Sequence, residues 1–245
     1  MRILSIDTST EIGSVALLDG DSLIAEVSVS RPMNQLTWLA PAIKQCMEQV
    51  SWQMSELEGI AVGCGPGSFT GLRIGIATAK SIAQVFSLPI VGVSSLDAIA
   101  YQCLSFHGTI CAVMKTRYIK RKETNEPLQY AKGGELFTAF YKSDGLRMVR
   151  TGDFIVESPI ELANRINLRG HHIGIVGDAG ISRERLIREL KVQYWWAPSV
   201  LEYPRGANIG YLAYISGELN EKKCNLEKIK AIYLRSQEYK TMTLN

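Results

Sequence analysis

Two segments near the start of the sequence contain residue types that could do chemistry. Residues 7–10 are Asp-Thr-Ser-Thr, and residues 63–75 contain five glycines. A carboxylate beside small hydroxyl groups can hold a hydrated metal and contact phosphate, and a glycine-rich loop that leads into a helix can bind an anion. Both segments are therefore candidate phosphate loops, although Asp7, Thr8, Ser9 and Thr10 also suit an ordinary turn.

The glycine segment does not match the known phosphate-binding spacings. A P-loop places a lysine directly after its second glycine, and no lysine follows here. The dinucleotide pattern G-x-G-x-x-G also fails, because Ser68 or Thr70 stands at the third glycine position. Among single residues of the segment, Cys64 is a candidate nucleophile, but a small buried thiol is the commoner situation.

Small residues recur every four positions after this loop, at Gly71, Gly75, Ala79 and Ala83. On a helix they form one narrow ridge that allows close approach of another segment. The period leaves two interpretations open, packing inside the chain's own lobe or contact with a partner. Trp38 has the same ambiguity, because it lies nearly opposite the apolar face of its predicted helix.

Composition favours a globular intracellular protein. Hydrophobic residues make up 46% and charged residues 21% of the chain. The longest charge-free stretches are too short and too polar to span a bilayer, and the start turns acidic too soon for a signal peptide. Three histidines and five cysteines without a C-x-x-C pair disfavour a metal site or a catalytic triad. We expect a cytoplasmic protein that binds no membrane and holds no metal.

Charge is unevenly distributed along the chain. Residues 1–105 carry a net charge of −4 and residues 106–245 a net charge of +7. Five cations lie between Lys115 and Lys122, and such a run can contact nucleic-acid phosphates. Lys120, Arg121 and Lys122 are therefore candidate tRNA contacts, with a solvated loop as the alternative.

The periodicity of apolar residues predicts an α/β protein of two lobes, residues 1–105 and 106–245, each in β-β-β-α-β-α order. The second lobe has a basic insertion at 115–134, and its last helix, 206–219, is expected to pack back on the first lobe. The expected strands are 2–7, 14–18, 23–29, 59–64, 90–93, 110–114, 135–141, 146–151, 172–176 and 230–234, and the expected helices are 34–50, 69–86, 95–104, 159–166, 182–190 and 206–219.

Several motifs together resemble the bacterial TsaB (YeaZ) family. The resemblance is strong over residues 1–100 and patchier afterwards. Its motifs are Ile6-Asp7-Thr8-Ser9-Thr10, Gly63-x-Gly-Pro-Gly-Ser-Phe-Thr-Gly-Leu-Arg-Ile-Gly75, Gly92-Val-Ser-Ser-Leu96, Gly134-Glu-Leu-Phe137, Val176-Gly-Asp178 and Tyr233-Leu-Arg235.

The resemblance implies an actin-like (ASKHA) fold and a role in forming N6-threonylcarbamoyladenosine (t6A) at position 37 of tRNAs that read codons beginning with A. It implies a non-catalytic subunit without a cofactor of its own, which pairs with the catalytic paralogue TsaD or with itself and acts with the ATPase TsaE. A nucleotide at the partner interface is left open. TsaD holds its metal with His-x-x-x-His, and Ser95 and Ile99 stand at those positions here.

The resemblance also implies roles for individual residues. Helices 34–50 and 69–86 would form the partner bundle, and 7–10 would be a vestigial phosphate loop. Contact with tRNA would be indirect, through the complex. The predicted interface residues are Trp38, Gly71, Arg73, Gly75, Ala79 and Ala83.

Three other functions remain as alternatives. An ATP-dependent small-molecule kinase of the actin-like class would use Asp7 and a second phosphate loop at Gly177–Gly180. A glycoprotease-like metallopeptidase is an older label for the superfamily and would need the missing histidines. A free-standing tRNA-binding module would depend on the basic run alone.

Overall fold

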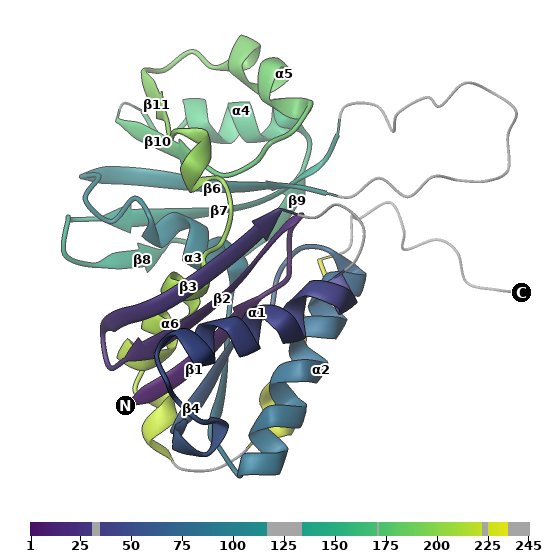
Figure 1. Cartoon of the computed structure of the whole chain (residues 1–245). Coiled ribbons are helices and arrows are strands. Elements are labelled where there is room, and N and C mark those ends of the chain that lie inside the picture. The colour runs from purple at the N-terminus through teal and green to yellow at the C-terminus, as the bar shows by residue number, and fades with distance from the viewer. Residues whose placement is uncertain (31–34, 117–133, 171, 222–224, 235–245) are drawn as a thin grey trace, which may run out of the picture. The chain divides into compact units, whose positions relative to one another are not determined.

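The computed structural model describes residues 1–30, 35–116, 134–170, 172–221 and 225–234. The chain divides into two compact units, Met1–Gln102 with Tyr203–Ile232, and Cys103–Glu202 with Tyr233–Asn245. Each unit has its own mixed sheet (Figure 1), which confirms the predicted α/β class. Within the described part of the chain, no helix combines the length and the apolar character needed to cross a membrane.

The first sheet has the strand order β3-β2-β1-β4-β5. The predicted antiparallel meander is present, and the turn between β2 and β3 uses Gly20 at a φ of +62°, a left-handed conformation that favours glycine. β4 runs parallel to β1, and β5 runs parallel to β4. The strands are β1 (Arg2–Asp7), β2 (Ile12–Asp19), β3 (Ser22–Ser30), β4 (Gly59–Gly63) and β5 (Ile90–Val93).

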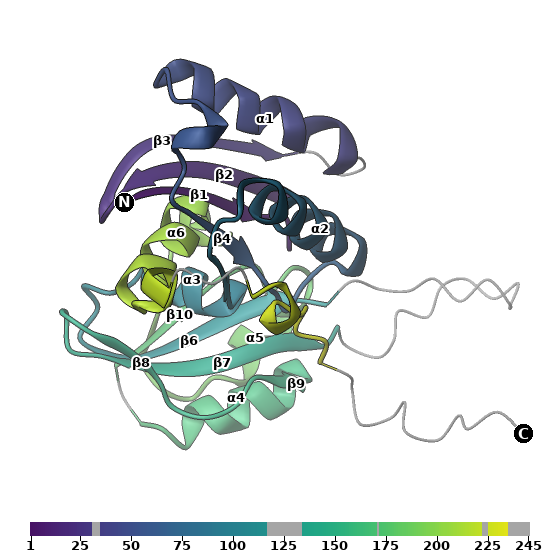
Figure 2. The same ribbon diagram turned by 90° about the horizontal axis from the view of Figure 1, so that it is seen from below.

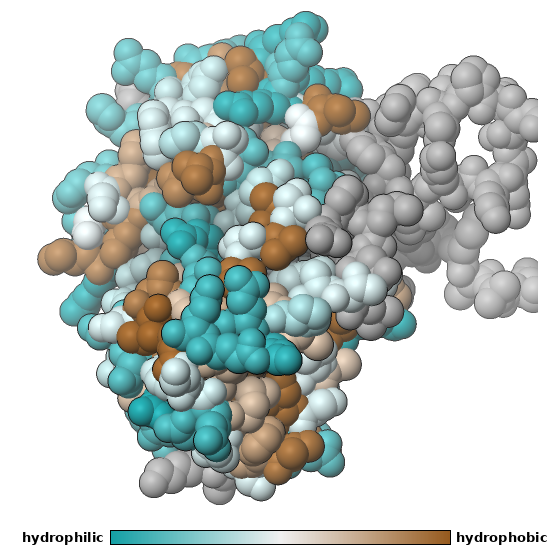
Figure 3. Space-filling view, in the orientation of Figure 1, coloured by the Kyte–Doolittle hydropathy of each residue, from teal (hydrophilic) through white to brown (hydrophobic). Residues whose placement is uncertain are grey.

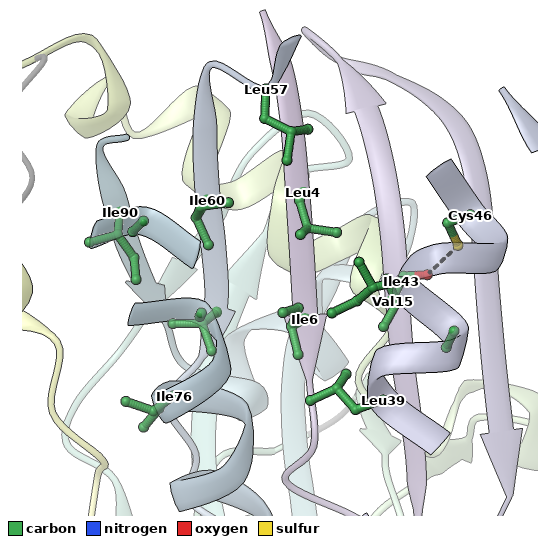
Figure 4. Packing of buried hydrophobic residues seen from close by; sticks show 14 of the residues in the cluster. Leu4, Ile6, Val15, Leu39, Ile43, Cys46, Leu57, Ile60, Ile76 and Ile90 are labelled. Atoms are coloured by element: carbon green, nitrogen blue, oxygen red, sulfur yellow. Dashed lines mark hydrogen bonds between the residues drawn. The ribbon is translucent and has the colours of Figure 1, made fainter. Parts of the chain in front are cut away.

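Helices cover both faces of this sheet (Figure 2). Leu4 and Ile6 of β1 point to the side of α1 and α2, where the largest hydrophobic cluster lies (Figure 4). Ile3 packs on the opposite face with Ile209 and Ala213 of α6. Because β1 is covered on both sides, it is apolar in a nearly continuous run. The helices are α1 (Gln35–Gln49), α2 (Phe69–Phe86), α3 (Ser95–Tyr101) and α6 (Gly206–Ile215).

The N-terminus of α6 is held by residues far away in the sequence. The N–H of Gly206 donates to Oγ of Ser14 at 2.9 Å, and the N–H of Ala207 donates to Oε1 of Glu26 at 3.0 Å. Glu26 also accepts the guanidinium of Arg205. The first backbone N–H groups of a helix lack partners within it, so β2 and β3 supply the cap that α6 does not carry itself.

The second sheet has the order β11-β10-β6-β7-β8, and β9 pairs with β7. Two helices pack on it through a cluster that includes Phe140, Leu162 and Leu186. The N-terminus of α4 carries a capping box made by Ser158 and Glu161. The elements are β6 (Gly108–Lys115), β7 (Leu136–Ser143), β8 (Met148–Arg150), β9 (Ile155–Glu157), α4 (Pro159–Asn167), β10 (Ile173–Val176), α5 (Ser182–Glu189) and β11 (Tyr194–Trp196).

Some predicted elements were wrong. The expected strand at 230–234 is not a strand, although the N–H of Ile232 donates to the carbonyl of Cys64 at 2.7 Å. The helix expected at 206–219 ends at Ile215, and Gly217 then turns the chain at a φ of +75°. The helix expected to extend to residue 104 ends at Tyr101. The strands β9 and β11 were missed because three residues are too few to show a period.

The cap on α6 predicts a measurable loss of stability in the variant Glu26→Gln. The side chain of Glu26 is 8% exposed, and its charge favours the positive end of the helix. We expect the free energy of unfolding in urea to fall by about 1 kcal/mol. Glu48→Gln is the matched control, because Glu48 is 66% exposed and pairs with Lys44 on α1. That control should change by less than about 0.5 kcal/mol, and equal effects of the two variants would contradict the capping role.

Candidate functional site

Three loops meet at the carboxyl ends of β1, β4 and β5. Parallel strands end at the same edge of a sheet, so the segments that follow them become neighbours. The N–H of Ser68 donates to the carbonyl of Ser9 at 2.7 Å, which joins the first loop to the second. The N–H of Ser95 donates to the carbonyl of Gly65 at 2.8 Å, which joins the second to the third. Both candidate phosphate loops therefore belong to one constellation.

The carboxylate of Asp7 lies at the centre of these loops and is fully buried. Its Oδ1 accepts the N–H of Ser9 at 2.9 Å and the hydroxyl of Ser9 at 2.7 Å. Its Oδ2 accepts the hydroxyl of Ser95 at 2.8 Å. Burial raises the pKa of Asp7 to about 6, and these hydrogen bonds oppose the rise.

The glycines of residues 63–75 make room for the segment Asp7–Ser9. A Cβ placed on Gly63 would lie 1.9 Å from Oδ2 of Asp7. On α2, a Cβ at Gly71 would lie 2.0 Å from the carbonyl oxygen of Thr8, and a Cβ at Gly75 would lie 2.2 Å from Oγ1 of Thr8. Any larger residue at these positions would displace the loop after β1, so the glycine spacing serves close approach of backbone rather than phosphate binding.

This geometry decides between the two interpretations of the small-residue ridge. Gly71 and Gly75 contact Thr8, and Ala79 and Ala83 are fully buried in the core of the first unit. The assignment of these four residues to a partner interface was therefore wrong, because their own sheet and loop cover them. The four-residue period identified a shared face of the helix but not what lies opposite it.

Trp38 is also covered within its own unit. It is 6% exposed, and a Cβ placed on Gly13 would lie 1.8 Å from Cζ2 of its indole ring. The ring thus packs on bare backbone of β2. Its assignment to the partner interface was wrong for the same reason, since a neighbouring element fills the space that a partner would need.

Arg73 is the predicted interface residue that the structure places on the outside of α2. Its guanidinium carbon lies 3.8 Å from the centre of the Phe69 ring, which is 51% exposed. Such a cation–π contact fixes a long side chain at the surface. Val85 and Phe86 at the other end of the helix are 75% and 38% exposed. We call Phe69 and Arg73 the outer face of α2.

Hydropathy does not single out a binding surface on the one face that Figure 3 shows. On the face drawn in Figure 3, hydrophobic residues outside the grey atoms form separate small groups among hydrophilic ones. A partner surface on this face would therefore depend on a few exposed anchors, as most interfaces do.

The predicted phosphate-loop residues are all engaged inside the unit. Besides the bonds of Asp7 and Ser9, the hydroxyl of Thr8 donates to the carbonyl of Gly71 at 2.7 Å. The hydroxyl of Thr10 donates to the carbonyl of Ile12 at 2.6 Å. A hydrated divalent cation needs carboxylate oxygens that can accept its water, and those of Asp7 already accept three protein donors. The donor set here fits a structural lock better than a metal site.

The turn Gly177–Gly180, the candidate second phosphate loop, is also held by contacts within its own unit. Oδ1 of Asp178 accepts the N–H of Gly180 at 2.7 Å, and its Oδ2 pairs with Nζ of Lys115 at 2.8 Å. Gly177 has a φ of +116°, and a Cβ there would lie 1.9 Å from the carbonyl oxygen of Val113. The turn thus ties the end of β10 to the end of β6.

The remaining candidates within the described part of the chain do not form a reactive centre. Burial raises the pKa of Cys64 to about 12, so its thiol stays protonated and packs as a small apolar group. Among the described residues, no three His, Cys, Asp or Glu side chains come together as metal ligands. Lys120, Arg121 and Lys122 lie outside the described residues, and their contact with tRNA stays a prediction.

Comparison with solved structures identifies the fold. A Pseudomonas aeruginosa protein described as similar to peptidase YeaZ matches with a TM-score of 0.74 and 21% identity over 96% of this chain and 99% of that chain. YeaZ from the same organism matches with a TM-score of 0.70 and 21% identity, over 95% and 100%. The chain thus has the two-lobed α/β fold of YeaZ proteins.

Sequence comparison gives the second step of the identification. The protein named tRNA threonylcarbamoyladenosine biosynthesis protein TsaB in Bacillus subtilis (strain 168) is 37% identical over 117 residues, 48% of this chain and 51% of that protein. The protein of that name in Escherichia coli (strain K12) is 33% identical over 144 residues, 59% and 56%. A family model described as "TsaD: tRNA N6-adenosine threonylcarbamoyltransferase" matches residues 33–124.

These matches confirm the predicted resemblance: the chain is similar in sequence and in fold to TsaB (YeaZ) proteins. The aligned region spans about half the length of the curated relatives.

The buried carboxylate predicts a pH-dependent stability that the variant Asp7→Asn should remove. The pKa of Asp7 is raised from 3.8 to about 6, so the folded protein binds this proton more tightly than the unfolded chain. The contribution of Asp7 is greatest below its unfolded pKa and is lost as pH rises through about 6, with a full cost of about 3 kcal/mol.

Asp7→Asn should therefore become more stable relative to the parent as pH rises from about 4 to about 7. The asparagine oxygen can still accept from Ser9, and its amide can donate to Oγ of Ser95. Urea unfolding of both proteins across this range measures the difference. A difference that stays constant with pH would show that Asp7 does not titrate as described.

Proposed function

We propose that this chain is a non-catalytic subunit required for t6A formation on tRNA, acting by binding a TsaD-like paralogue together with a TsaE-like ATPase. The relatives that it matches carry the name of this biosynthesis. A domain related to a threonylcarbamoyltransferase model supports a partner of the same superfamily. The substrate tRNA would be contacted through the complex.

The observation that carries the non-catalytic role is the closed state of the Asp7 loop. In an actin-like enzyme this carboxylate would have to face metal or phosphate. Here Ser9 and Ser95 occupy both of its oxygens, and α2 packs against Thr8 without a gap. The alternative of an ATP-dependent kinase requires this loop to open. A metallopeptidase requires metal ligands at positions 95 and 99, where the side chains of Ser95 and Ile99 are a hydroxyl and a hydrocarbon.

The outer face of α2 is the partner surface that we propose in place of the buried ridge. It keeps Arg73 from the original prediction and adds Phe69, whose ring holds the guanidinium. Exposed aromatic and arginine side chains are the types that dominate interface energetics. Gly75→Leu is unsuitable as an interface variant, because it would collide with Thr8 before any partner was involved.

Reconstitution of tRNA threonylcarbamoylation from purified components tests the role. Product measured by mass spectrometry should disappear when this chain is omitted. Arg73→Glu should reduce product formation by at least about tenfold, as expected for loss of an interface anchor worth 1.4 kcal/mol or more. Arg185→Glu is the matched control, because Arg185 is an exposed arginine on α5 of the second unit.

Equal product with and without the chain would contradict the function itself. Full activity of Arg73→Glu in a system that depends on the chain would contradict only the proposed surface. Hydrolysis of ATP by the isolated chain, abolished in Asp7→Asn, would favour the kinase alternative.

The predicted tRNA contact has a separate test. Reversing the charges of Lys120, Arg121 and Lys122 together should weaken tRNA binding by the assembled complex and reduce the dependence of binding on salt concentration, because phosphate contacts release counterions. Fluorescence anisotropy with labelled tRNA at several salt concentrations measures both effects. Unchanged affinity and unchanged salt dependence would dismiss the contact.

A further inference from the structure

Residues 225–232, which we call the tail segment, pack on the first unit. Ile229 is 5% exposed and lies in the largest hydrophobic cluster, together with side chains of α2 and β5. Leu226, Ala231 and Ile232 are half-buried against the same cluster. The tail segment therefore belongs to the core of the first unit, although it follows the second unit in the sequence.

The tail segment is seated where β4 passes into the glycine loop. The N–H of Ile232 donates to the carbonyl of Cys64 at 2.7 Å. A Cβ placed on Gly92 of β5 would lie 2.6 Å from Sγ of Cys64 and 3.6 Å from Cδ1 of Ile229. The thiol and the Ile229 side chain therefore come close together over the bare backbone of β5.

One peptide group connects this contact to the buried carboxylate of Asp7. The carbonyl of Cys64 and the N–H of Gly65 belong to the same planar peptide unit, so the direction of one end fixes the direction of the other. The N–H of Gly65 donates to Oγ of Ser95 at 3.2 Å, and the hydroxyl of Ser95 donates to Oδ2 of Asp7 at 2.8 Å. Three hydrogen bonds thus run in one direction, from the N–H of Ile232 to the carboxylate, and bonds in such a chain strengthen one another.

The tail segment is held more weakly than the strands beside it. Among the described residues, the bond from Ile232 to Cys64 is the one hydrogen bond that joins the segment to the rest of the unit. Its regular structure is a single 3₁₀ turn, Leu226–Lys228. The strand β1, in contrast, is bonded on one side to β2 and on the other to β4. Segments with few such contacts open locally at a lower free energy than core strands.

We propose that the tail segment is a latch on the glycine loop. Its docking holds the Cys64–Gly65 peptide group in the orientation that the Asp7 loops need, and it can leave its seat while the first sheet stays folded. Release of the latch frees this peptide group to turn, which loosens the hold on Ser95 and on the loop before α2. The inference goes beyond the proposed function, because it concerns closure of the first unit and requires no partner.

Hydrogen exchange of the full chain, resolved to single residues by mass spectrometry, tests the latch. The amides of Ser68 and Ser95 report closure of the loops, because both donate across them, and the amides of β1 report unfolding of the sheet. In the parent chain, Ser68 and Ser95 should exchange at least about tenfold faster than β1, because a local opening precedes global unfolding. Exchange of both amides at the rate of β1 would overturn the proposal.

Two similar truncations separate the latch from a general loss of stability. Ile229→Ala and Leu219→Ala each remove a buried aliphatic side chain, at 5% and 1% exposure, and each should accelerate exchange of β1. Leu219 packs near Gly59, in the cluster on the opposite face of the sheet. Ile229→Ala alone should accelerate Ser68 and Ser95, by at least about tenfold, because it alone weakens the latch. Equal acceleration of these two amides by both variants would contradict the latch.

Variants of Ile232 test the hydrogen bond itself. Ile232→Pro lacks the N–H that the carbonyl of Cys64 accepts, so it should accelerate exchange of Ser95 as Ile229→Ala does. Ile232→Val keeps the N–H and should exchange like the parent, and equal behaviour of the two variants would overturn the proposal. If circular dichroism shows that Ile232→Pro is unfolded, thiol modification of the parent replaces it. A maleimide should then modify Cys64 at least about tenfold faster than the fully buried Cys46, and equal rates would exclude the latch.

Discussion

The arrangement of the first unit depends on the burial of one carboxylate. An ionised group without exposure is strongly unfavourable unless donors surround it, and Asp7 receives three, from Ser9 and Ser95. Those donors come from the loops after β1 and β5, and the loop after β4 fills the space between them. Because the three loops must converge within hydrogen-bond distance, β4 can bear no side chain at Gly63, and α2 can bear none where it crosses Thr8.

This constraint connects the glycine segment to the proposed role. A phosphate loop needs backbone N–H groups and hydroxyls that face a ligand. In this chain the corresponding groups face each other, and the helix after the loop lies directly on the segment Asp7–Ser9. The outcome is a rigid platform from which the outer side of α2 projects. A protein that positions a partner benefits from such rigidity, whereas a nucleotide-processing enzyme needs the same loop to be open.

Most of the fold could be predicted because its elements are long and regularly patterned. The meander of β1 to β3 and the helix α2 follow from alternation, the Asp-Gly turn and an uninterrupted helical period. The site was predicted less well. The period of Gly71, Gly75, Ala79 and Ala83 identifies a face of a helix but not what covers it. Gly71 and Gly75 lie against Thr8, 63 residues before Gly71, and Ala79 and Ala83 pack in the hydrophobic core. One signal could have suggested this contact. The loop at 7–10 and the glycine loop each follow a strand of the same sheet, so they are expected to lie at the same edge.

Glu26 shows most clearly why sequence patterns reach a limit. In the sequence it is one charge in an alternating strand, which indicates a solvated outer face. In the structure the carboxylate of Glu26 caps a helix that begins 180 residues later. A tertiary contact therefore decides that this side chain points toward α6.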